Sequence, residues 1–474
     1  MQKNRAPFIT LITVFFFWGF VAASNDILIP VFKEKLNLEQ WQSQLISVAF
    51  YLAYTVGSVI YLLLSRFYGG DILNKLGYKN GIALGLTISA FGTLLFYPAA
   101  EMVSFGLMIT GLFIVALGFS LQQTAANPLV IVMGDASKGS QRLSLAGGIN
   151  NLGTTIGPLV VSFAIFGQLG NALKLSDIGA VKFPYLILGA AFLVVAIIFK
   201  FSKLPNQVFA EDAKDTSENQ RSSAINYPQL SLGMIAIFLY VGVEVSTASN
   251  LPEYMLQYCN IQTSQAAPYI SLFWASLMIG RWNGSAGAFT ESRQLKNVLR
   301  FIMPYLAFAV FLLVNALANS DIAVFYPYGL VILIMILADL LSQGNPAKQL
   351  MIFSFCAIAA LIIGMLSSGL LSVYAFISVG LFCSTLWPCI FTLAIAGLGK
   401  FTNQGSSYLI MMIMGGGLVS WLQGWLSGSD MLGIKYSYLV GVVCFLYLAF
   451  YGWKVKSILK AQAIDLTPTQ TSGH

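Results

Sequence analysis

Charged residues are scarce in this sequence. Asp, Glu, Lys and Arg together make up 9% of it, whereas hydrophobic residues make up 57% and the mean hydropathy is +0.77. A soluble domain carries about 25% charged residues. The composition therefore leaves too little polar surface for a soluble protein and predicts an integral membrane protein.

Several catalytic and metal-binding signatures are also missing. The one histidine is His474, the last residue, which argues against a histidine proton relay or a histidine metal site. The five cysteines occur singly in or beside apolar segments, without the spacing of a zinc site or a disulfide framework. No GxxxxGK[ST], HExxH or GxSxG motif is present. We therefore expect neither an enzyme nor an ATP-driven pump, and no metal or cofactor.

Long apolar stretches dominate the sequence. A spanning helix needs about 20 apolar residues, and fourteen stretches are suitable. The one long polar interruption, Ser202 to Asn226, is rich in charged, Ser and Asn residues and predicts a solvated linker between two halves. The predicted helices occupy roughly residues 8–30, 43–65, 80–99, 103–133, 143–168, 183–202, 228–251, 267–289, 298–318, 323–341, 350–368, 371–396, 406–427 and 436–455.

The basic residues predict the orientation of these helices. If the N-terminus is cytoplasmic, nineteen of the 25 Lys and Arg residues lie at the cytoplasmic side, and five lie outside. This distribution follows the positive-inside rule and indicates that both termini are cytoplasmic. It also explains the net charge of +7 as topology and contact with anionic lipid, so we expect no nucleic-acid partner.

Two acids interrupt apolar runs. Asp26 lies in the first run and Glu244 in the seventh. An ionisable group inside a spanning helix costs roughly 2.5–3.5 kcal/mol on insertion scales and usually faces a water-filled path or a partner. Both acids are therefore candidates for proton coupling, although Asp26 could instead cap the helix end before Pro30. Asp339 ends a predicted helix, and we expect it at the membrane interface.

Amides and glycines are concentrated in the fourth and fifth predicted helices. Gln123 and Asn127 are four residues apart and therefore share a helix face, and Asn150 follows in the next helix. Their alternative role is hydrogen bonding between helices. Gly153 and Gly157 have the small-xxx-small spacing that lets helix backbones approach closely, and we expect them to be packing residues.

Amides and acids beside aromatic rings suit a polyhydroxylated substrate. Each hydroxyl that leaves water must find a hydrogen-bond partner, and a sugar ring also has an apolar face that stacks on aromatics. The mid-helix aromatic residues available for such contacts are Trp18, Tyr51, Tyr54, Tyr240, Trp274 and Trp387.

Six further motifs occur in order along both halves of the sequence: NDILIP, AFYLAY, KLGYKNG, LQQTAANP, RLSLAGGINNLGTTIGP and GLGKFTNQGSSYLIMMIMGG. As a set they resemble the fucose–proton symporter group of the major facilitator superfamily, which includes bacterial glucose/galactose and N-acetylglucosamine permeases. The resemblance implies two pseudo-symmetric six-helix bundles, alternating access and a sugar site between the bundles.

The resemblance also implies roles for individual residues. The acid of the first helix corresponds to Asp26, with Asn25 beside it, and the asparagine of the fifth helix corresponds to Asn150. Gln123 replaces a glutamate of the fucose symporter and cannot titrate, so Glu244 is the candidate for a second acid. Arg281, near a predicted cytoplasmic helix end, is expected to act in gating or anchoring.

The complete prediction is an all-α membrane protein of about fourteen helices with the major facilitator fold. We expect an N-terminal bundle (1–203), a linker (204–227), a C-terminal bundle (228–460) and a cytoplasmic tail (461–474). The segment NPAKQLMIFSFCAIAALIIGML resembles the family's ninth helix, so the resemblance implies that the helices at about 298–341 are an inserted pair. The remaining site predictions are substrate contacts from Asn25, Asp26, Gln123, Asn127, Asn150, Tyr51, Tyr54, Glu244, Trp274 and Trp387, and cytoplasmic anchoring by Arg142.

The predicted function is proton-coupled symport of a monosaccharide or amino sugar by a monomer in a bacterial-type inner membrane, with Na⁺ as the alternative coupling ion. The main alternative is a drug–proton antiporter, which would prefer a large apolar pocket. A sensor or a flippase for lipid-linked sugars is a more distant alternative.

Overall fold

The computed structural model describes residues 7–21, 40–134, 138–166, 182–202, 204, 223–261, 266–289, 292–428 and 430–464. The first described helix is Pro7–Val21. The others are α2 (Gln40–Phe67), α3 (Ile72–Leu76), α4 (Tyr78–Leu94), α5 (Phe96–Glu101), α6 (Phe105–Val132), α7 (Gly139–Phe166), α8 (Lys182–Phe201), α9 (Pro228–Cys259), α10 (Ala267–Gly284), α11 (Ala286–Phe289), α12 (Arg293–Leu317), α13 (Tyr328–Ser342), α14 (Pro346–Leu366), α15 (Gly369–Cys383), α16 (Leu386–Ile395), α17 (Thr402–Met411), α18 (Gly415–Leu426), α19 (Gly433–Ser437) and α20 (Leu439–Ala461).

Helices occupy all fourteen predicted segments wherever the structure describes them. Ten helical stretches of the described chain are long and apolar enough to cross a membrane, and two shorter apolar helices, Pro7–Val21 and Tyr185–Phe201, accompany them. α7 and α10 account for the other two predicted segments. Since lipid offers no hydrogen-bond partners, a spanning segment must satisfy its backbone internally, and the helix does so.

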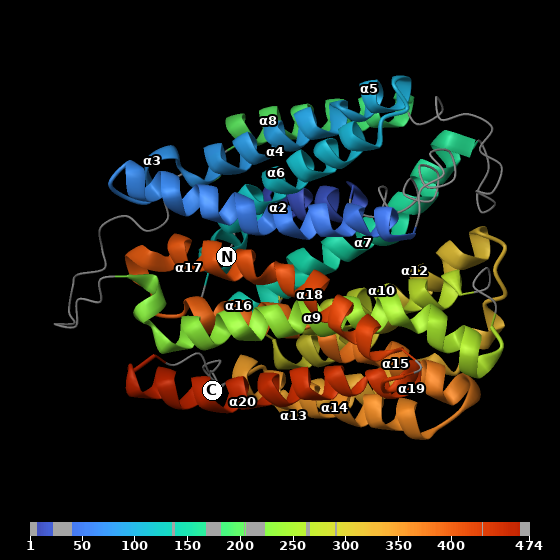
Figure 1. Ribbon diagram of the computed structural model, residues 1–474. Helices are drawn as coiled ribbons and strands as arrows, with labels where there is room; N and C mark the ends of the chain where they lie inside the picture. Colours follow the sequence, from blue (N-terminus) through green and yellow to red (C-terminus); the bar gives the residue numbers. More distant parts are fainter. Residues whose placement is uncertain are drawn as a thin grey trace.

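Two groups of helices lie side by side (Figure 1). In the upper group α4 packs against α6 and α8, and α2 packs against α6. In the lower group α9 packs against α16, α18 and α20. α7 follows α6 in the chain and also packs against α10 of the lower group, and α2 packs against α17. These two contacts join the groups.

The packing of α14 repeats the packing of α4. α4 contacts α6 and α8, and α14 contacts α15 and α20 in the corresponding way. α12 and α13 coincide with the predicted inserted pair and lie outside this repeat, because α12 packs mainly against α10 and α13 mainly against α14. The domain boundaries derived from the sequence stay a prediction.

Gly153 and Gly157 are packing residues, as predicted. A Cβ added at Gly153 would lie 2.3 Å from the carbonyl oxygen of Phe16, and one at Gly157 would lie 2.7 Å from that of Phe20. Both contacts are too short for a real side chain, so the two glycines allow α7 to cross closely over the first helix.

Two apolar stretches of the lower group are interrupted near their middle. α15 ends at Cys383 and α16 begins at Leu386, with Pro388 in the first turn of α16. α17 and α18 are separated by a short 3-10 turn, Met412–Met414. α6, by contrast, remains continuous although it contains Pro128. The α15–α16 break exposes a main-chain carbonyl that becomes part of the candidate site.

Candidate functional site between the two helix groups

Arg281 on α10 connects the two groups. Its Nε donates a hydrogen bond to the Ser384 carbonyl, 3.0 Å away, in the break between α15 and α16. Its Nη1 donates to Asn151 Oδ1 at 3.0 Å and to the Gly147 carbonyl at 3.4 Å, both on α7. The next residue, Trp282, donates through Nε1 to the Gly148 carbonyl at 3.2 Å. Arg281 therefore holds elements of both groups through neutral acceptors.

Glu244 belongs to the same cluster. It lies on α9 one turn after Tyr240, and it interacts electrostatically with Arg281. Tyr240 is buried and packs against Trp387 of α16, with ring centroids 6.2 Å apart. The structure thus brings an acid, a cation and two aromatic rings from α9, α10 and α16 together next to α7.

A second polar group lies between α2 and α6. Gln123 donates through Nε2 to the Tyr54 hydroxyl at 3.0 Å. Tyr51, three residues before Tyr54, reaches the lower group, because a Cβ added at Gly416 of α18 would lie 3.1 Å from its ring. Tyr51, Tyr54 and Gln123, which were predicted separately, therefore lie on neighbouring helices at the boundary of the two groups.

The three asparagines of α6 and α7 have different surroundings. Asn127 is 2% exposed, and its Nδ2 has no hydrogen-bond partner among the described residues. Asn150 donates through Nδ2 to the Phe15 carbonyl of the first helix, at 2.9 Å. Its neighbour Asn151, which the sequence reasoning missed, is the one that accepts from Arg281. The two adjacent asparagines were visible in the sequence, but the sequence does not show which of the two side chains points toward Arg281.

Trp274 lies on the Arg281 side of α10. It precedes Arg281 by seven residues, which places both on one helix face. Met278, between them, contacts Thr155 of α7 with a distance of 4.0 Å between sulfur and hydroxyl. Trp274 is 38% exposed and packs edge-on against Phe273. An indole on the α7-facing side of α10 that keeps this exposure can contact a solute between the groups.

Arg142 has a different environment from Arg281. It is buried near the start of α7 and donates through Nε to the Val130 carbonyl at 3.0 Å and through Nη2 to the Ile131 carbonyl. These carbonyls belong to the last turn of α6, where main-chain acceptors lack partners within the helix. Arg142 therefore fastens the α6–α7 connection within one group.

The two groups are also joined where α2 meets α17. Ser407 Oγ donates to the Ser58 carbonyl at 3.3 Å, and Thr55 Oγ1 donates to the Met411 carbonyl at 3.2 Å. At the start of α17, the side chain of Asn403 accepts from the Tyr78 hydroxyl and donates to Asn74 Oδ1 at 3.1 Å. These bonds and those of Arg281 form the seam between the groups, and this name is kept below.

Asp71 supports the seam from the α2–α3 turn. Its Oδ1 accepts hydrogen bonds from the Tyr61 hydroxyl at 2.6 Å and from the Leu73 N–H at 2.8 Å, and so it caps α3. Burial raises the pKa of this carboxyl, while these hydrogen bonds act in the opposite direction. α3 in turn carries Asn74, the partner of Asn403.

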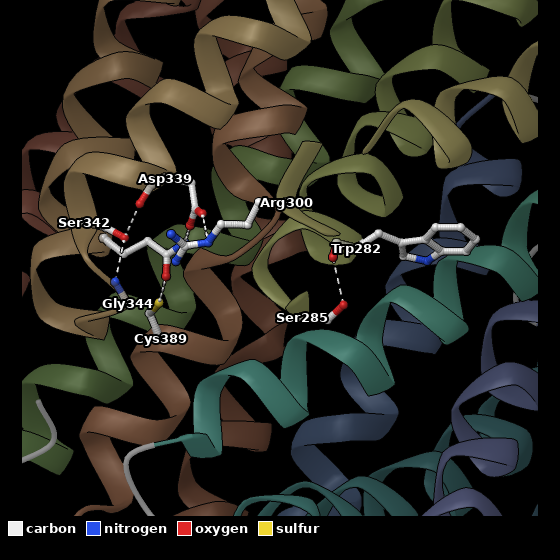
Figure 2. Close-up of polar contacts among 8 residues, drawn as sticks. Trp282, Ser285, Arg300, Asp339, Ser342, Gly344 and Cys389 are labelled. Atoms are coloured by element: carbon white, nitrogen blue, oxygen red, sulfur yellow. Dashed lines mark hydrogen bonds and ion pairs between the residues drawn. The ribbon is translucent and has the colours of Figure 1, made fainter. Parts of the chain in front are cut away.

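Asp339 is buried within the protein and paired with a cation, a contact that the sequence did not predict, while its expected depth at the membrane interface stays a prediction. Asp339 is 2% exposed, and its Oδ2 lies 3.2 Å from Nε of Arg300, which is 8% exposed (Figure 2). Gln349 Nε2 donates to Asp339 Oδ1 at 2.8 Å. The pairing was missed because an acid at the end of an apolar run does not reveal a buried partner on another helix.

Asn25 and Asp26 lie outside the described residues, so their predicted roles stay predictions. Within the described ranges, no group of three His, Cys, Asp or Glu residues is placed to hold a metal ion. The candidate site of the described chain therefore consists of Arg281, Glu244, amides and aromatic rings. Such groups can bind hydroxyls, exchange a proton through the carboxyl and stack on an apolar ring face.

The sequence and the fold were compared with those of known proteins. A model of the Major Facilitator Superfamily matches residues 8–345. The "Glucose/galactose transporter" of Brucella abortus biovar 1 (strain 9-941) is 34% identical over 454 residues, covering 95% of this chain and 94% of that protein. The "L-fucose-proton symporter" of Escherichia coli (strain K12) is 29% identical and covers 93% of this chain and 90% of its own length.

Among solved structures, the transporter FucP in the outward conformation superimposes with a TM-score of 0.72 at 27% identity, covering 95% of this chain and 99% of that chain. The family model spans more than half of the chain, and the Brucella relative exceeds 30% identity over nearly all of it. The chain therefore belongs to the Major Facilitator Superfamily.

Proposed function

We propose that the protein is a secondary active transporter that carries a monosaccharide or amino sugar together with a proton. The observation that carries this proposal is the Arg281–Glu244 cluster at the seam, with Trp387 and Tyr240 beside it. Relatives of 34% and 29% identity named as glucose/galactose and fucose transporters support the sugar class.

The site suits a sugar because it mixes donors, acceptors and rings. Gln123 with the Tyr54 hydroxyl, Asn150 and Glu244 can meet hydroxyl groups, and Trp274 and Trp387 can cover an apolar ring face. Each hydroxyl that loses water without gaining a partner costs about 1–3 kcal/mol, so a sugar needs such a polar lining and an apolar drug does not. This polarity favours the sugar over the antiporter alternative.

Proton coupling is assigned to Glu244 and Asp26. When Glu244 is ionised, it offers a counter-charge to Arg281, whose hydrogen bonds go to neutral acceptors on α7 and at Ser384. A proton on Glu244 removes that counter-charge and changes the electrostatic balance at the seam. This couples protonation to the separation of α7 from α10. Asp26 is the second candidate acid, and Na⁺ is the alternative coupling ion.

The proposed setting is a bacterial inner membrane, with a monomer whose termini are cytoplasmic. The seam contacts of Asn403, with Tyr78 and Asn74, lie at the helix ends that the distribution of Lys and Arg assigns to the cytoplasm. The described conformation is then closed on the cytoplasmic side. Alternating access requires that these bonds break when the sugar is released.

The test is uptake into proteoliposomes of labelled monosaccharides and amino sugars, with and without an inward proton gradient. One pH unit corresponds to 1.36 kcal/mol, so one-to-one symport can accumulate a sugar about tenfold. We expect Glu244→Gln and Asp26→Asn to lose this accumulation. The matched control is Glu253→Gln, an exposed acid of the same helix α9 whose side chain bonds Gln257.

Uptake that is independent of the proton gradient but is driven by a Na⁺ gradient would show that Na⁺ is the coupling ion. Uptake that is independent of both gradients would indicate a uniporter. A wild-type chain that moves no sugar would overturn the proposal and favour the drug antiporter. Gradient-driven accumulation that persists in both acid variants would remove Asp26 and Glu244 from the coupling role.

A further inference from the structure

The inserted helices α12 and α13 share a buried ion pair (Figure 2). Arg300 of α12 and Asp339 of α13 are 8% and 2% exposed, and Nε and Oδ2 are 3.2 Å apart. The Asp339 carbonyl also accepts from Ser342 Oγ at 2.6 Å, and Ser342 Oγ accepts from the Gly344 N–H at 3.3 Å. The acid is thus fixed both by its side chain and through the turn that follows α13.

Hydrogen bonds continue from this pair into the core of the lower group. Gln349 of α14 donates through Nε2 to Asp339 Oδ1 at 2.8 Å. The other end of the same amide, Oε1, accepts from the thiol of Cys389 on α16, with 3.5 Å between sulfur and oxygen. A single glutamine therefore connects the inserted pair to α16, and all of its contacts are buried.

A buried ion pair contributes little net free energy to the stability of a protein. Desolvation of two charges offsets much of their attraction, and apolar replacement of both partners is often neutral or stabilising. Helices α12 and α13 already present apolar surface, so packing alone could dock them in the membrane. A series of directional hydrogen bonds that ends on α16 restricts the orientation of that helix, whereas apolar packing does not.

This series of hydrogen bonds, which ends at Cys389, lies close to the proposed sugar site. Cys389 is two residues from Trp387, which packs against Tyr240, the neighbour of Glu244. The break that starts α16 contains the Ser384 carbonyl, which accepts from Arg281. A rotation or shift of this ten-residue helix would move both the indole and the carbonyl.

We propose that Arg300, Asp339 and Gln349 are positioning residues that orient α16, and through it Trp387 and the Ser384 carbonyl, for sugar binding. The inserted helix pair thereby acts as a brace for the substrate site. This inference rests on the proposed function.

The test compares sugar uptake by the wild type, Arg300→Met/Asp339→Leu and Gln349→Met. The double variant removes both charges at once and leaves no lone buried ion, so it is expected to fold. We expect KM to rise about tenfold in the double variant and less in Gln349→Met, with Vmax changed by less than about threefold. The control is Lys182→Met/Glu101→Met, which removes an ion pair of the upper group and is expected to leave KM unchanged.

A second measurement distinguishes orientation of α16 from a general loss of structure. In a Trp387→Leu background the positioning effect has lost one of its two targets, so the double variant should raise KM by a smaller factor than it does in the wild-type background, and the two changes should not be fully additive. Full additivity, or a wild-type KM in a folded double variant, would overturn the inference. A wild type that moves no sugar would instead overturn the proposed function, so the two failures are distinguishable.

Discussion

Two arginines of the lower helix group, Arg281 on α10 and Arg300 on α12, satisfy their guanidinium groups in different ways. Arg300 is paired directly with the Asp339 carboxylate on α13, which also accepts from Gln349 on α14, and all three residues belong to the same group. Arg281 binds carbonyls and an amide, and α7, which supplies two of these acceptors, packs across the seam. An ion pair suits a contact that stays closed, whereas neutral acceptors suit one that must open.

The energetic reason lies in what each arginine would leave behind. Separation of a buried ion pair leaves two uncompensated charges, and removal of one partner costs about 3–5 kcal/mol. Separation of Arg281 from α7 leaves one carbonyl, that of Gly147, and one amide, that of Asn151, and water can satisfy both. The Arg281 contact can therefore break and reform during transport at a smaller cost than the Arg300 contact.

The largest effect on transport is expected from replacement of Arg281. In Arg281→Met the seam loses three hydrogen bonds and Glu244 loses its counter-charge. We expect gradient-driven uptake to fall by about 100-fold or more while the chain still folds. Measurement of uptake against protein amount in proteoliposomes checks this.

The control for this change is Arg281→Lys. It keeps the charge but not the planar fork, so a partial recovery of uptake is expected. If Arg281→Met transported normally, the seam would not depend on this residue, and the contrast between the two arginines would lose its functional meaning.

The next effect concerns the stability of the lower group. Asp339→Asn leaves Arg300 buried without a counter-ion, which we expect to destabilise the protein by about 3–5 kcal/mol. The double replacement Arg300→Met/Asp339→Leu should be much less destabilising. Thermal unfolding in detergent, followed for the wild type and both variants, checks the order. A single variant as stable as the wild type would show that the pair is not an obligate ionic contact.

The helical architecture was predictable because the membrane restricts it strongly. Apolar length alone located the fourteen segments, and the family motifs supplied the plan of two halves. The polar contacts were harder to predict from the sequence. Asn151 was missed beside Asn150, and the Ser384 carbonyl has no side-chain signature at all. The buried pairing of Asp339 was missed because its partner Arg300 lies on the preceding helix, in a segment whose position within the bundle only the fold reveals.

The smallest effect on stability is expected at Asp71, whose carboxylate accepts hydrogen bonds from two neutral donors, the Tyr61 hydroxyl and the Leu73 N–H. Burial raises the pKa of its carboxyl in the folded protein, so the folded state binds this proton more tightly than the unfolded state. Stability from this group therefore falls as pH rises from the ordinary aspartate pKa through the raised one, and it is constant above both values.

Asp71→Asn should remove this dependence while Oδ1 still accepts from Tyr61 and Leu73. We expect the melting temperature of the variant at neutral pH to equal that of the wild type or exceed it by about 1–2 °C, with the difference shrinking as pH is lowered. Asp339→Asn should behave in the opposite way at neutral pH, because Asp339 has a cation as its partner. A clear loss of stability in Asp71→Asn would mean that the negative charge itself supports α3 and the seam, and that the two acids are alike.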